Sequence, residues 1–292
     1  MILVADSGST KTTWACIDIN EGTKHELHPV TSQGINPIRD NEEVITKAID
    51  RAREQLYQQA QTIQNAPFAP DAITAIHFYG SGCIPPYSTT VKRILQRAYP
   101  RADVSVESDM LGATLALCGH NEGIACILGT GSNSCLFDGE KIISQTPALG
   151  FILGDEGSGA SLGKRLVSDI LKKQLPTNIQ EAFIQETDLT QAEIINRVYR
   201  QPQPNRFLAS LTPFLERHLD ENSVRELVID EFRRFLSRNI RNYDRPDLPI
   251  HFVGGITASF QSELEEALKR EGMKMGRILS KPISGMVAYF LP

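Results

Sequence analysis

The chain has 292 residues, of which 41% are hydrophobic and 22% charged, and its formal net charge at pH 7 is -5. This length is enough to bury a substantial core and is more typical of two lobes than of one. A nucleic-acid-binding protein would show a basic face or stripe, and the sequence has only short basic pairs. We therefore expect no nucleic-acid partner.

The sequence has no sign of secretion or membrane insertion. Its first apolar stretch, Met1 to Ala5, lacks the length and the basic region of a signal peptide. No run approaches the ~18 apolar residues of a membrane helix. The cysteines are odd in number and mostly flanked by apolar residues, which is typical of reduced core thiols: Cys16, Cys83, Cys118, Cys126 and Cys135. We expect a cytoplasmic protein that does not bind a membrane.

The first part of the chain predicts an α/β unit. Residues 2–5 and 12–19 read as strands joined at Ser7-Gly8, and a polar meander follows them. Apolar residues at helical spacing then predict a long amphipathic helix over 42–63. Strands over 72–79 and 103–107 alternate with helices over 91–98 and 112–117. The order is β-β-β-α-β-α-β-α.

The opening hairpin then recurs. The segment "GIACILGTGSNSCLFDGEKIIS" contains strands joined by a turn at 129–132, roughly 120 residues after the first turn, about one compact α/β domain later. Two copies of one hairpin suggest two related lobes. The remaining sequence predicts helices over 160–175, 191–199, 207–219, 224–240 and 259–270, strands over 251–253 and 275–279, and a short helix after Pro282.

Each hairpin turn is a candidate phosphate site. The Walker pattern fails because Thr10 precedes Lys11, and the dinucleotide pattern fails because Leu162 stands at its third glycine position. Tight turns of small residues can instead bring backbone N–H groups and hydroxyls to phosphate oxygens. In "DSGSTKTT" the hydroxyls and the lysine from Ser7 to Thr13 could surround an anion. The alternative is a plain polar turn.

Two aspartates follow strands in positions suited to chemistry. Asp6 ends the first strand, where it could hold Mg²⁺ beside a phosphate or could cap the turn. Asp109 lies at the carboxyl end of the strand over 103–107, where it could act as a general base or as a helix N-cap. Strand alternation points the nearby Glu107 away from the side that Asp109 occupies.

Four further motifs have both a structural and a functional interpretation. "GDEGSG", 154–159, is either a flexible loop that caps a helix or a polar rim that accepts hydrogen bonds from substrate hydroxyls. Within 159–163 a G-x-S-x-G match lacks the preceding strand that a hydrolase elbow needs. Cys118 and His120 have no second pair at zinc-finger spacing. Gly254 and Gly255 form either a packed turn or a flat platform for a base and ribose.

Taken in order, "ADSGSTKT", "SDMLGA", "LGTGSN", "GDEGS" and "FVGG" resemble the actin-like ATPase and sugar-kinase superfamily. More narrowly, they resemble the N-acetylglucosamine kinase branch of the family that includes the BadF/BadG/BcrA/BcrD ATPases. The resemblance spans nearly the whole chain. It implies an α/β fold of two ribonuclease-H-like lobes with ATP in the interlobe cleft. Residues 1–112 would form the N-terminal lobe, on which helix 282–292 packs back, and 113–281 the C-terminal lobe.

The resemblance also implies roles for individual residues. Asp6 would bind Mg²⁺, and Asp109 would be the catalytic base. The residues implied for ATP and its phosphates are Ser9, Thr10, Lys11, Gly129, Thr130, Gly131, Ser132, Gly254 and Gly255. Those implied for the sugar are Asn36, Ser81, Gly82, Asp109 and Glu156.

These features favour an ATP-dependent kinase that phosphorylates the 6-hydroxyl of an amino sugar, with N-acetylglucosamine as the preferred candidate. The short second lobe leaves the identity of the sugar open. One alternative is a BadF/BadG-type ATPase that activates a partner enzyme, although no cysteine follows Cys135 to hold the iron–sulfur cluster of those proteins. Another is a non-catalytic ATP-binding sensor, which would not need both Asp6 and Asp109. The expected partner is a small-molecule sugar, and a homodimer is left open.

Overall fold

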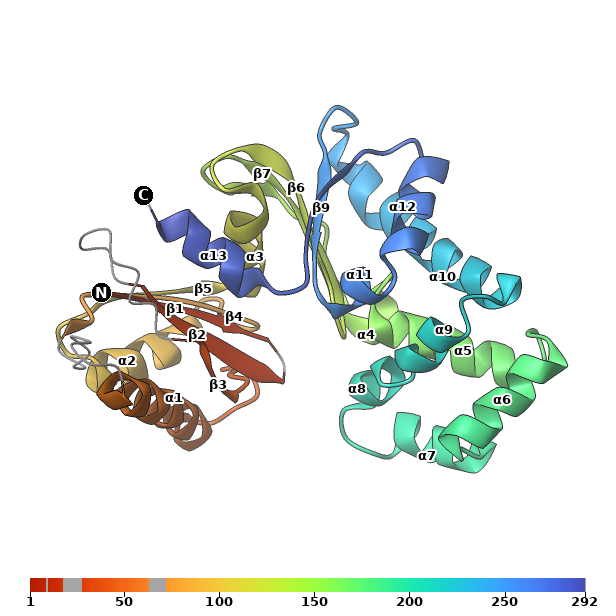
Figure 1. The fold of residues 1–292 in the computed structure, drawn as a ribbon, viewed down its shortest axis with the longest axis horizontal. Helices are drawn as coiled ribbons and strands as arrows, with labels where there is room; N and C mark the ends of the chain where they lie inside the picture. The colour runs from red at the N-terminus through yellow and green to blue at the C-terminus, as the bar shows by residue number, and fades with distance from the viewer. Residues whose placement is uncertain (9, 18–27, 63–71, 292) are drawn as a thin grey trace. The chain divides into compact units, whose positions relative to one another are not determined.

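The computed structural model describes residues 1–8, 10–17, 28–62 and 72–291 (Figure 1). The chain divides into two compact units. Unit 1 comprises Met1–Gly119 and Lys281–Pro292, and unit 2 comprises His120–Ser280. Each unit has its own mixed five-stranded sheet and its own hydrophobic core.

The sheet of unit 1 is built around a central strand whose apolar middle is buried. Its order is β3(Val30–Gln33), β2(Lys11–Ile17), β1(Ile2–Ser7), β4(Ala75–Gly80) and β5(Asp103–Ser108). β1 runs antiparallel to β2 and parallel to β4. The apolar run Leu3–Ala5 is buried because both faces of the sheet are covered. In Figure 1, α1(Glu42–Thr62) and α2(Ser88–Ala98) cover one face, and α3(Asp109–Cys118) and α13(Pro282–Phe290) cover the other.

The last helix of the chain packs closely on α3. A Cβ added at Gly112 of α3 would lie 2.6 Å from Tyr79 Cβ, and one added at Gly285 of α13 would lie 2.5 Å from the Ala116 carbonyl oxygen. The ring of Phe290 stacks on that of His77 with their centroids 4.2 Å apart. Because these glycines have no side chain, the backbone of α3 packs directly against β4, and the backbone of α13 packs directly against α3.

Unit 2 repeats the sheet topology of unit 1. Its order is β8(Ile142–Ser144), β7(Ser132–Asp138), β6(Glu122–Leu128), β9(Ile250–Val253) and β10(Met275–Leu279). β6 runs antiparallel to β7 and parallel to β9, as β1 runs with β2 and β4. The predicted recurrence of the hairpin is therefore confirmed, and it extends to the whole sheet.

Helices make up the rest of unit 2. They are α4(Gly150–Leu153), α5(Gly159–Leu171), α6(Thr177–Thr187), α7(Gln191–Tyr199), α8(Pro204–Ala209), α9(Thr212–Arg217), α10(Asn222–Phe235), α11(Gly255–Ser259) and α12(Gln261–Arg270). A π-helical turn, Leu236–Ile240, and a 3-10 turn, Arg241–Tyr243, follow α10. Their apolar faces join the sheet in one core that includes Phe183, Phe214, Phe232, Phe235, Phe252 and Phe260.

Several predicted element boundaries were wrong. The helix expected over 207–219 is two short helices, α8 and α9, because Pro213 has no N–H to continue the hydrogen-bonding of the first. The helix expected over 224–240 is α-helical only to Phe235. The helix expected to reach 175 ends at Leu171, shortly before Lys173 adopts a φ of 56°. α6 was not predicted, and most of the expected meander lies outside the described residues.

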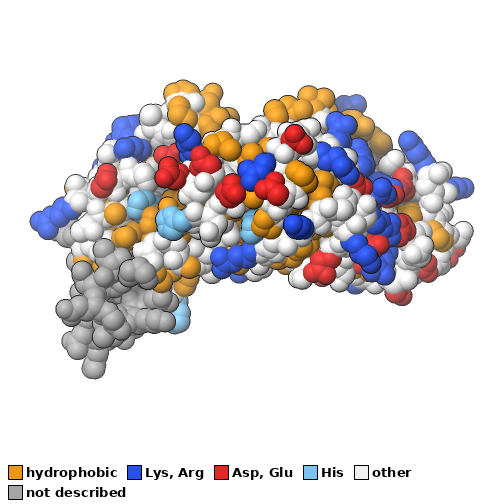
Figure 2. Space-filling view, turned by 90° about the horizontal axis from the view of Figure 1, so that it is seen from above, with side chains coloured by type: hydrophobic (Ala, Val, Ile, Leu, Met, Phe, Trp, Pro, Cys, Tyr) orange, Lys and Arg blue, Asp and Glu red, His pale blue; other side chains and the backbone are white. Residues whose placement is uncertain are grey.

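All five cysteines lie in the described residues, are buried and form no disulfide bond, as expected for core thiols. Within the described residues, no helix combines the length and the apolar character needed to cross a membrane. On the face shown in Figure 2, basic and acidic side chains are interspersed rather than gathered by sign. In the described part of the chain many charged side chains form surface ion pairs, such as Arg270 with Glu226 at 2.7 Å.

Candidate functional site

In unit 1, the predicted residues gather where parallel strands end. β1, β4 and β5 run in the same direction, with Asp6 opposite Tyr79 and Gly80 opposite Ser108. Asp6 therefore lies at the same sheet edge as the start of α3, where the crevice of an open α/β sheet usually binds its ligand. Ser108 is the N-cap of α3, because its Oγ accepts a hydrogen bond from the Leu111 N–H at 3.3 Å. Asp109 is then the first helical residue and not the cap.

The Asp109 carboxylate acts electrostatically on Asp6. Burial and the nearby Asp109 carboxylate raise the pKa of Asp6 to about 7, although the ammonium of Lys11 opposes the shift. Burial raises the pKa of Asp109 as well, against a hydrogen bond from the Met110 N–H. Two such carboxylates repel each other when both are ionised, and a cation would relieve the repulsion.

The Asp6 carboxylate is of the kind that binds magnesium in proteins. Mg²⁺ is usually held by one or two carboxylates together with substrate phosphates, whereas an all-protein cage is rare. No group of three or more His, Cys, Asp or Glu side chains in the described residues could form such a cage. The hard oxygen donors of Asp6 are therefore suited to a metal that phosphate oxygens help to bind.

Some of the hydroxyls of the first hairpin are not available to a phosphate. Ser7 Oγ lies 2.8 Å from Thr12 Oγ1 and accepts a hydrogen bond from the Ile35 N–H at 2.9 Å. Thr12 Oγ1 donates to the Gln33 carbonyl at 3.0 Å. Both side chains are fully buried, so the expectation that they surround an anion was wrong. They fix the segment after β3 against β1.

Of the other predicted residues of this turn, Thr13 is buried in β2, whereas Thr10 and Lys11 lie at the surface. The turn is closed by a hydrogen bond from the Gly8 N–H to the Lys11 carbonyl at 3.0 Å. Thr10 and Lys11 are exposed, Lys11 being the first residue of β2. Ser9 lies outside the described residues.

Asn36, Ser81 and Gly82 come together beside β1. Gly82 has a φ of 75°, and a Cβ added to it would lie 2.4 Å from Asn36 Oδ1, so only glycine fits there. The Ser81 N–H donates to the Ser7 carbonyl at 3.0 Å, which joins this turn to the end of β1. The residues implied for the sugar in unit 1 therefore share one end of its sheet with Asp6.

Cys83 is a residue of this region that the sequence analysis missed. Its Sγ lies 2.9 Å from the position of a Cβ at Gly80, the last residue of β4. Burial and the Asp109 carboxylate raise the pKa of the thiol to about 12, so Cys83 remains protonated near Asp109. No pattern in the sequence distinguishes it from the other core cysteines.

In unit 2, the predicted glycine turn joins the N-terminus of α5. The Gly129 N–H donates to the Gly131 carbonyl at 2.9 Å, and the Gly159 N–H donates to the Gly129 carbonyl at 2.8 Å. The Ala160 N–H donates to the Thr130 carbonyl at 3.0 Å. Residues 129–131 and the start of α5 therefore form one hydrogen-bonded structure.

Asp155 covers this turn, and the sequence analysis had not selected it. Its Oδ1 accepts a hydrogen bond from the Ser132 N–H at 3.2 Å, and its Oδ2 lies 3.0 Å from the position of a Cβ at Gly131. Asp155 has a φ of 56°, which turns its side chain toward the glycines. Burial raises the pKa of its carboxyl. The acidic pair in "GDEGS" was the available signal, and Glu156 was chosen in its place.

Glu156 lies on the other side of that loop, in an ion pair. It is buried, and its Oε1 accepts a hydrogen bond from Arg238 Nε at 2.5 Å. Its Oε2 lies 3.4 Å from Asn239 Nδ2. Arg238 and Asn239 belong to the π-helical turn, and nothing in the sequence pointed to either. π-helical turns occur frequently at functional sites.

The remaining glycine and serine motifs have different roles. Gly254 has a φ of 130°, and a Cβ there would lie 2.1 Å from the Leu128 carbonyl, so this glycine allows close strand packing. A Cβ at Gly255 would meet nothing within 4 Å, which leaves room for a ligand to approach. Ser161, in the G-x-S-x-G match, is buried in α5 and donates to Glu231 Oε1 at 2.5 Å.

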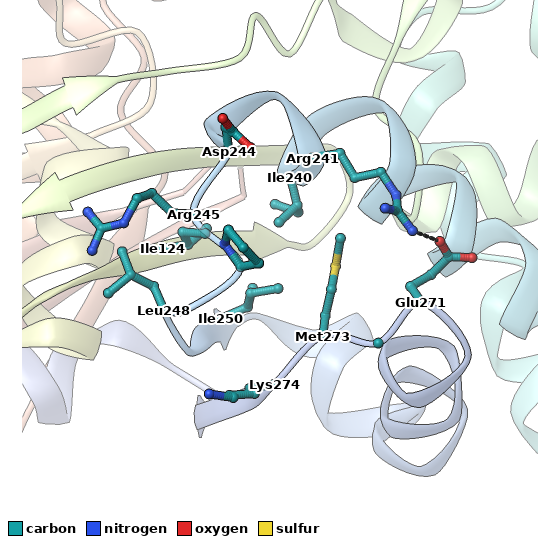
Figure 3. Close-up of a pocket in the computed structure, with 12 residues that line it drawn as sticks. Ile124, Ile240, Arg241, Asp244, Arg245, Leu248, Ile250, Glu271, Met273 and Lys274 are labelled. Atoms are coloured by element: carbon teal, nitrogen blue, oxygen red, sulfur yellow. Dashed lines mark hydrogen bonds and ion pairs between the residues drawn. The ribbon is translucent and has the colours of Figure 1, made fainter.

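A separate pocket of about 270 Å³ in unit 2 lies at the opposite ends of the strands (Figure 3). Ile124 and Ile250, near the starts of β6 and β9, line it together with Met273. Arg241 on its rim pairs with Glu271 at 2.6 Å. Because ligands of open α/β sheets bind at the carboxyl ends of the strands, this pocket is not the candidate site.

Comparison with known proteins places the chain among sugar kinases. No model of a known protein family matches it. A solved structure from Porphyromonas gingivalis, provisionally named an N-acetylglucosamine kinase, is 43% identical and has a TM-score of 0.90; the match covers 99% of this chain and 98% of that one. A protein of the same provisional name from Chromobacterium violaceum is 19% identical over 99% of this chain and 98% of its own, with a TM-score of 0.75.

Two further matches are more distant or partial. A ROK family glucokinase from Streptomyces griseus, solved with glucose and AMPPNP, shares the fold with a TM-score of 0.55 at 15% identity, covering 98% of this chain and 97% of that one. The glucosamine kinase GspK of Vibrio cholerae serotype O1 is 35% identical over 82 residues. That match spans 27% of this chain and only 27% of the glucosamine kinase.

Proposed function

Because the chain belongs to the N-acetylglucosamine kinase-like sugar kinases of the actin-like ATPase fold, we propose that it transfers the γ-phosphoryl group of ATP to an amino sugar. The favoured acceptor is the 6-hydroxyl of N-acetylglucosamine. The observation that carries this proposal is the Asp6 and Asp109 pair at the end of parallel strands in unit 1. The names of the Porphyromonas gingivalis and Vibrio cholerae proteins, both for kinases of amino sugars, support the substrate class.

Asp109 is the proposed general base. The sugar hydroxyl oxygen attacks the γ-phosphorus, the bond from that phosphorus to the bridging oxygen of ADP breaks, and the hydroxyl proton passes to the Asp109 carboxylate. A carboxylate whose pKa is raised is a stronger base than an ordinary aspartate, and burial raises it here. Asn36, Ser81 and Gly82 would position the sugar beside it.

Asp6 and Lys11 would serve the phosphates. Mg²⁺, when bound, neutralises charge on the phosphoryl oxygens, and Asp6 is its proposed ligand. Lys11 is exposed at the start of β2, with its charge close enough to lower the pKa of Asp6. With Thr10 and Ser9 it would contact the transferred group. Phosphoryl transfer depends mainly on such positioning and charge stabilisation.

The glycine turn of unit 2 would also hold phosphate. Gly129 and Ser132 already use their N–H groups, so the turn's donors without a partner in the described part of the chain are those of Thr130 and Gly131. Two adjacent amides of this kind form an anion-binding concavity. Gly255, which is open to approach, would face the adenosine, while Gly254 would set the path of the backbone.

The decisive variant is Asp109→Asn. We expect ATP to bind with unchanged affinity while sugar-dependent ADP release falls by ~10²–10⁴, the usual contribution of a general base. Glu107→Gln is the matched control, since Glu107 is exposed near the end of β5. Turnover of Asp109→Asn close to that of the unmodified protein would remove Asp109 as the base.

A sugar panel separates the proposal from its alternatives. ADP release should be negligible without sugar and should rise with N-acetylglucosamine. Turnover that is independent of every sugar would instead indicate an ATPase that activates a partner. ATP binding without turnover would indicate a sensor.

A further inference from the structure

Glu231 is a buried charged residue in α10, a helix that packs against α5 within unit 2 (Figure 1). A buried carboxylate costs free energy unless hydrogen bonds and an opposite charge compensate it, and an apolar side chain would fill the same space at lower cost. We therefore expect both oxygens of Glu231 to have specific partners. The other buried residues of α10 are apolar: Val224, Leu227, Val228, Ile229, Phe232 and Phe235.

The two oxygens of Glu231 bind different groups. Oε1 accepts hydrogen bonds from Ser161 Oγ at 2.5 Å and from the Gly157 N–H at 3.4 Å. Oε2 accepts a hydrogen bond from Arg234 Nη1 at 3.0 Å, and the Arg234 side chain is 56% exposed. The charge of Glu231 is thus balanced by a residue that reaches solvent, while Oε1 binds the loop before α5 and the first turn of that helix.

The Gly157 N–H and the Ser161 hydroxyl depend on this carboxylate. Both residues are buried, and neither group has another hydrogen-bond partner among the residues that the structure describes. The backbone of Gly157 also lies directly against α10, since a Cβ added there would be 2.9 Å from Phe235 Cβ. Because an unpaired buried donor is unfavourable, loss of the acceptor should displace this loop from α10.

The same loop holds the candidate phosphate turn. Segment 155–160 is joined to turn 129–132 by hydrogen bonds at 2.8, 3.0 and 3.2 Å. Two N–H groups at the start of α5 donate to carbonyl oxygens of the turn, and the Asp155 carboxylate accepts an N–H from it. Glu231 binds the segment near its middle and just beyond its end. A shift of the segment would therefore carry the turn with it.

We propose that Glu231 is a positioning residue for phosphate binding. Its carboxylate fixes segment 155–160, and this segment fixes the turn so that the N–H groups of Thr130 and Gly131, two partly exposed residues, are directed at the phosphates. This inference rests on the proposed kinase function, and all of these residues belong to unit 2. Donors that are oriented in advance bind an anion without a further cost of ordering. The role needs an acceptor oxygen at this position and not a charge.

Four variants separate positioning from charge and from packing. Glu231→Leu removes both acceptor oxygens and leaves an apolar side chain in the core. Glu231→Gln removes the charge but keeps an oxygen that can accept from Ser161 and Gly157. Ser161→Ala removes one of the two donors and suits a helix. Glu226→Leu is the matched control, because Glu226 is on the same helix, is 38% exposed and pairs with Arg270.

The measurement is the Kd of MgATP and the Kd of adenosine, by calorimetry without sugar. Glu231→Leu should raise the Kd of MgATP by about tenfold or more, as expected when hydrogen bonds to a charged group are weakened. It should leave the Kd of adenosine unchanged, because adenosine has no phosphate. Ser161→Ala should raise the Kd of MgATP by a smaller factor. Glu231→Gln and Glu226→Leu should bind MgATP as the unmodified protein does.

Three results would overturn the inference. Glu231→Leu could bind MgATP as well as the unmodified protein, or it could weaken MgATP and adenosine equally, which would indicate a purely structural role. Glu231→Gln could bind MgATP as weakly as Glu231→Leu, which would indicate that the charge matters and not the position of the acceptor. If circular dichroism shows that Glu231→Leu does not fold, Ser161→Ala decides with the same two ligands.

If the unmodified protein binds no MgATP, the kinase proposal fails separately. Hydrogen exchange of the amides in 129–132 and 155–160 then decides whether Glu231 positions the turn. Faster exchange of both ranges in Ser161→Ala, with unchanged exchange in Glu226→Leu, is the supporting result. Exchange in Ser161→Ala equal to that of the unmodified protein would show that the turn keeps its position without this contact.

Discussion

At the scale of single residues, Asp6 lowers the stability of the folded chain. A carboxyl whose pKa is raised by folding, here from 3.8 to about 7, prefers to be protonated in the folded state. Below the unfolded pKa the carboxyl is protonated in both states, so it costs no stability. As the pH rises from the unfolded pKa to the folded pKa, the carboxyl ionises in the unfolded chain first, and the free energy of unfolding falls. Above pH 7 the ionised carboxylate is therefore destabilising, by about 4 kcal/mol at 1.4 kcal/mol per pKa unit.

Asp6→Asn should therefore stabilise the protein in the absence of metal and nucleotide. The increase in Tm should be larger at pH 8 than at pH 5, because the aspartate it replaces is increasingly ionised over that interval. Thermal unfolding in EDTA measures it, and the exposed Asp50→Asn is the control. The same variant should lose kinase activity. An equal gain at both pH values would show that Asp6 has an ordinary pKa.

The sequence was enough to predict the two aspartates of the candidate site. It was not enough to predict the hydrogen-bond partners and the burial of the residues around them. Asp6 and Asp109 were found because each lies at the end of a predicted strand, and strands can be predicted from the pattern and the length of their apolar runs. Ser7 and Thr12 were misjudged because their burial depends on β3, and that strand was not resolved from the polar meander. Asp155 was passed over because its orientation depends on its φ of 56°, which no sequence pattern specifies.

At the scale of elements, α3 is a helix without a polar face. Its residues from Met110 to Cys118 are nearly all buried, although a surface helix usually has one polar side. The reason is that α3 lies between the sheet and α13. Gly285 makes this packing possible, because a Cβ there would lie 2.5 Å from the backbone oxygen of Ala116.

Gly285→Ala should therefore destabilise unit 1. Overpacking against a backbone atom costs roughly 1–3 kcal/mol, which exceeds the gain in helix propensity from replacing glycine. Chemical denaturation followed by circular dichroism measures the change. Ser284→Ala, an exposed position one residue earlier in α13, should be neutral or slightly stabilising. Equal stability of the two variants would contradict the close packing of α13 on α3.

The strands were easier to predict than the helices of unit 2. Both hairpins combine apolar strands with a glycine turn, a local signal that needs no tertiary context. α6 has only Ile179 and Phe183 buried, so its helical periodicity is weak. The change from α-helix to π-helix after Phe235 has no signal in the sequence, and there Asn239 contacts Glu156, a residue distant in sequence.

At the scale of the whole molecule, the two units share one sheet topology, but unit 2 is formed by one continuous chain segment and unit 1 by two. The fold class was predictable because the hairpin recurs, and the match to the Porphyromonas gingivalis structure confirms it. Unit 2 is a single segment, and its core runs from Ile124 to Leu268 without residues from unit 1. Unit 1 instead needs the last residues of the chain, because α13 covers the outer side of α3.

The isolated segment 120–280 should therefore fold on its own, with native-like circular dichroism and one cooperative thermal transition. Segment 1–119 alone should be less stable and prone to aggregate, because without α13 the apolar side of α3 is exposed to water. Joining residues 281–292 to it through a flexible Gly/Ser linker should restore stability, whereas the same linker with Gly285→Ala should do so only in part. If segment 1–119 is equally stable with and without α13, the burial of α3 does not depend on the C-terminal helix, and the discontinuous core of unit 1 is refuted.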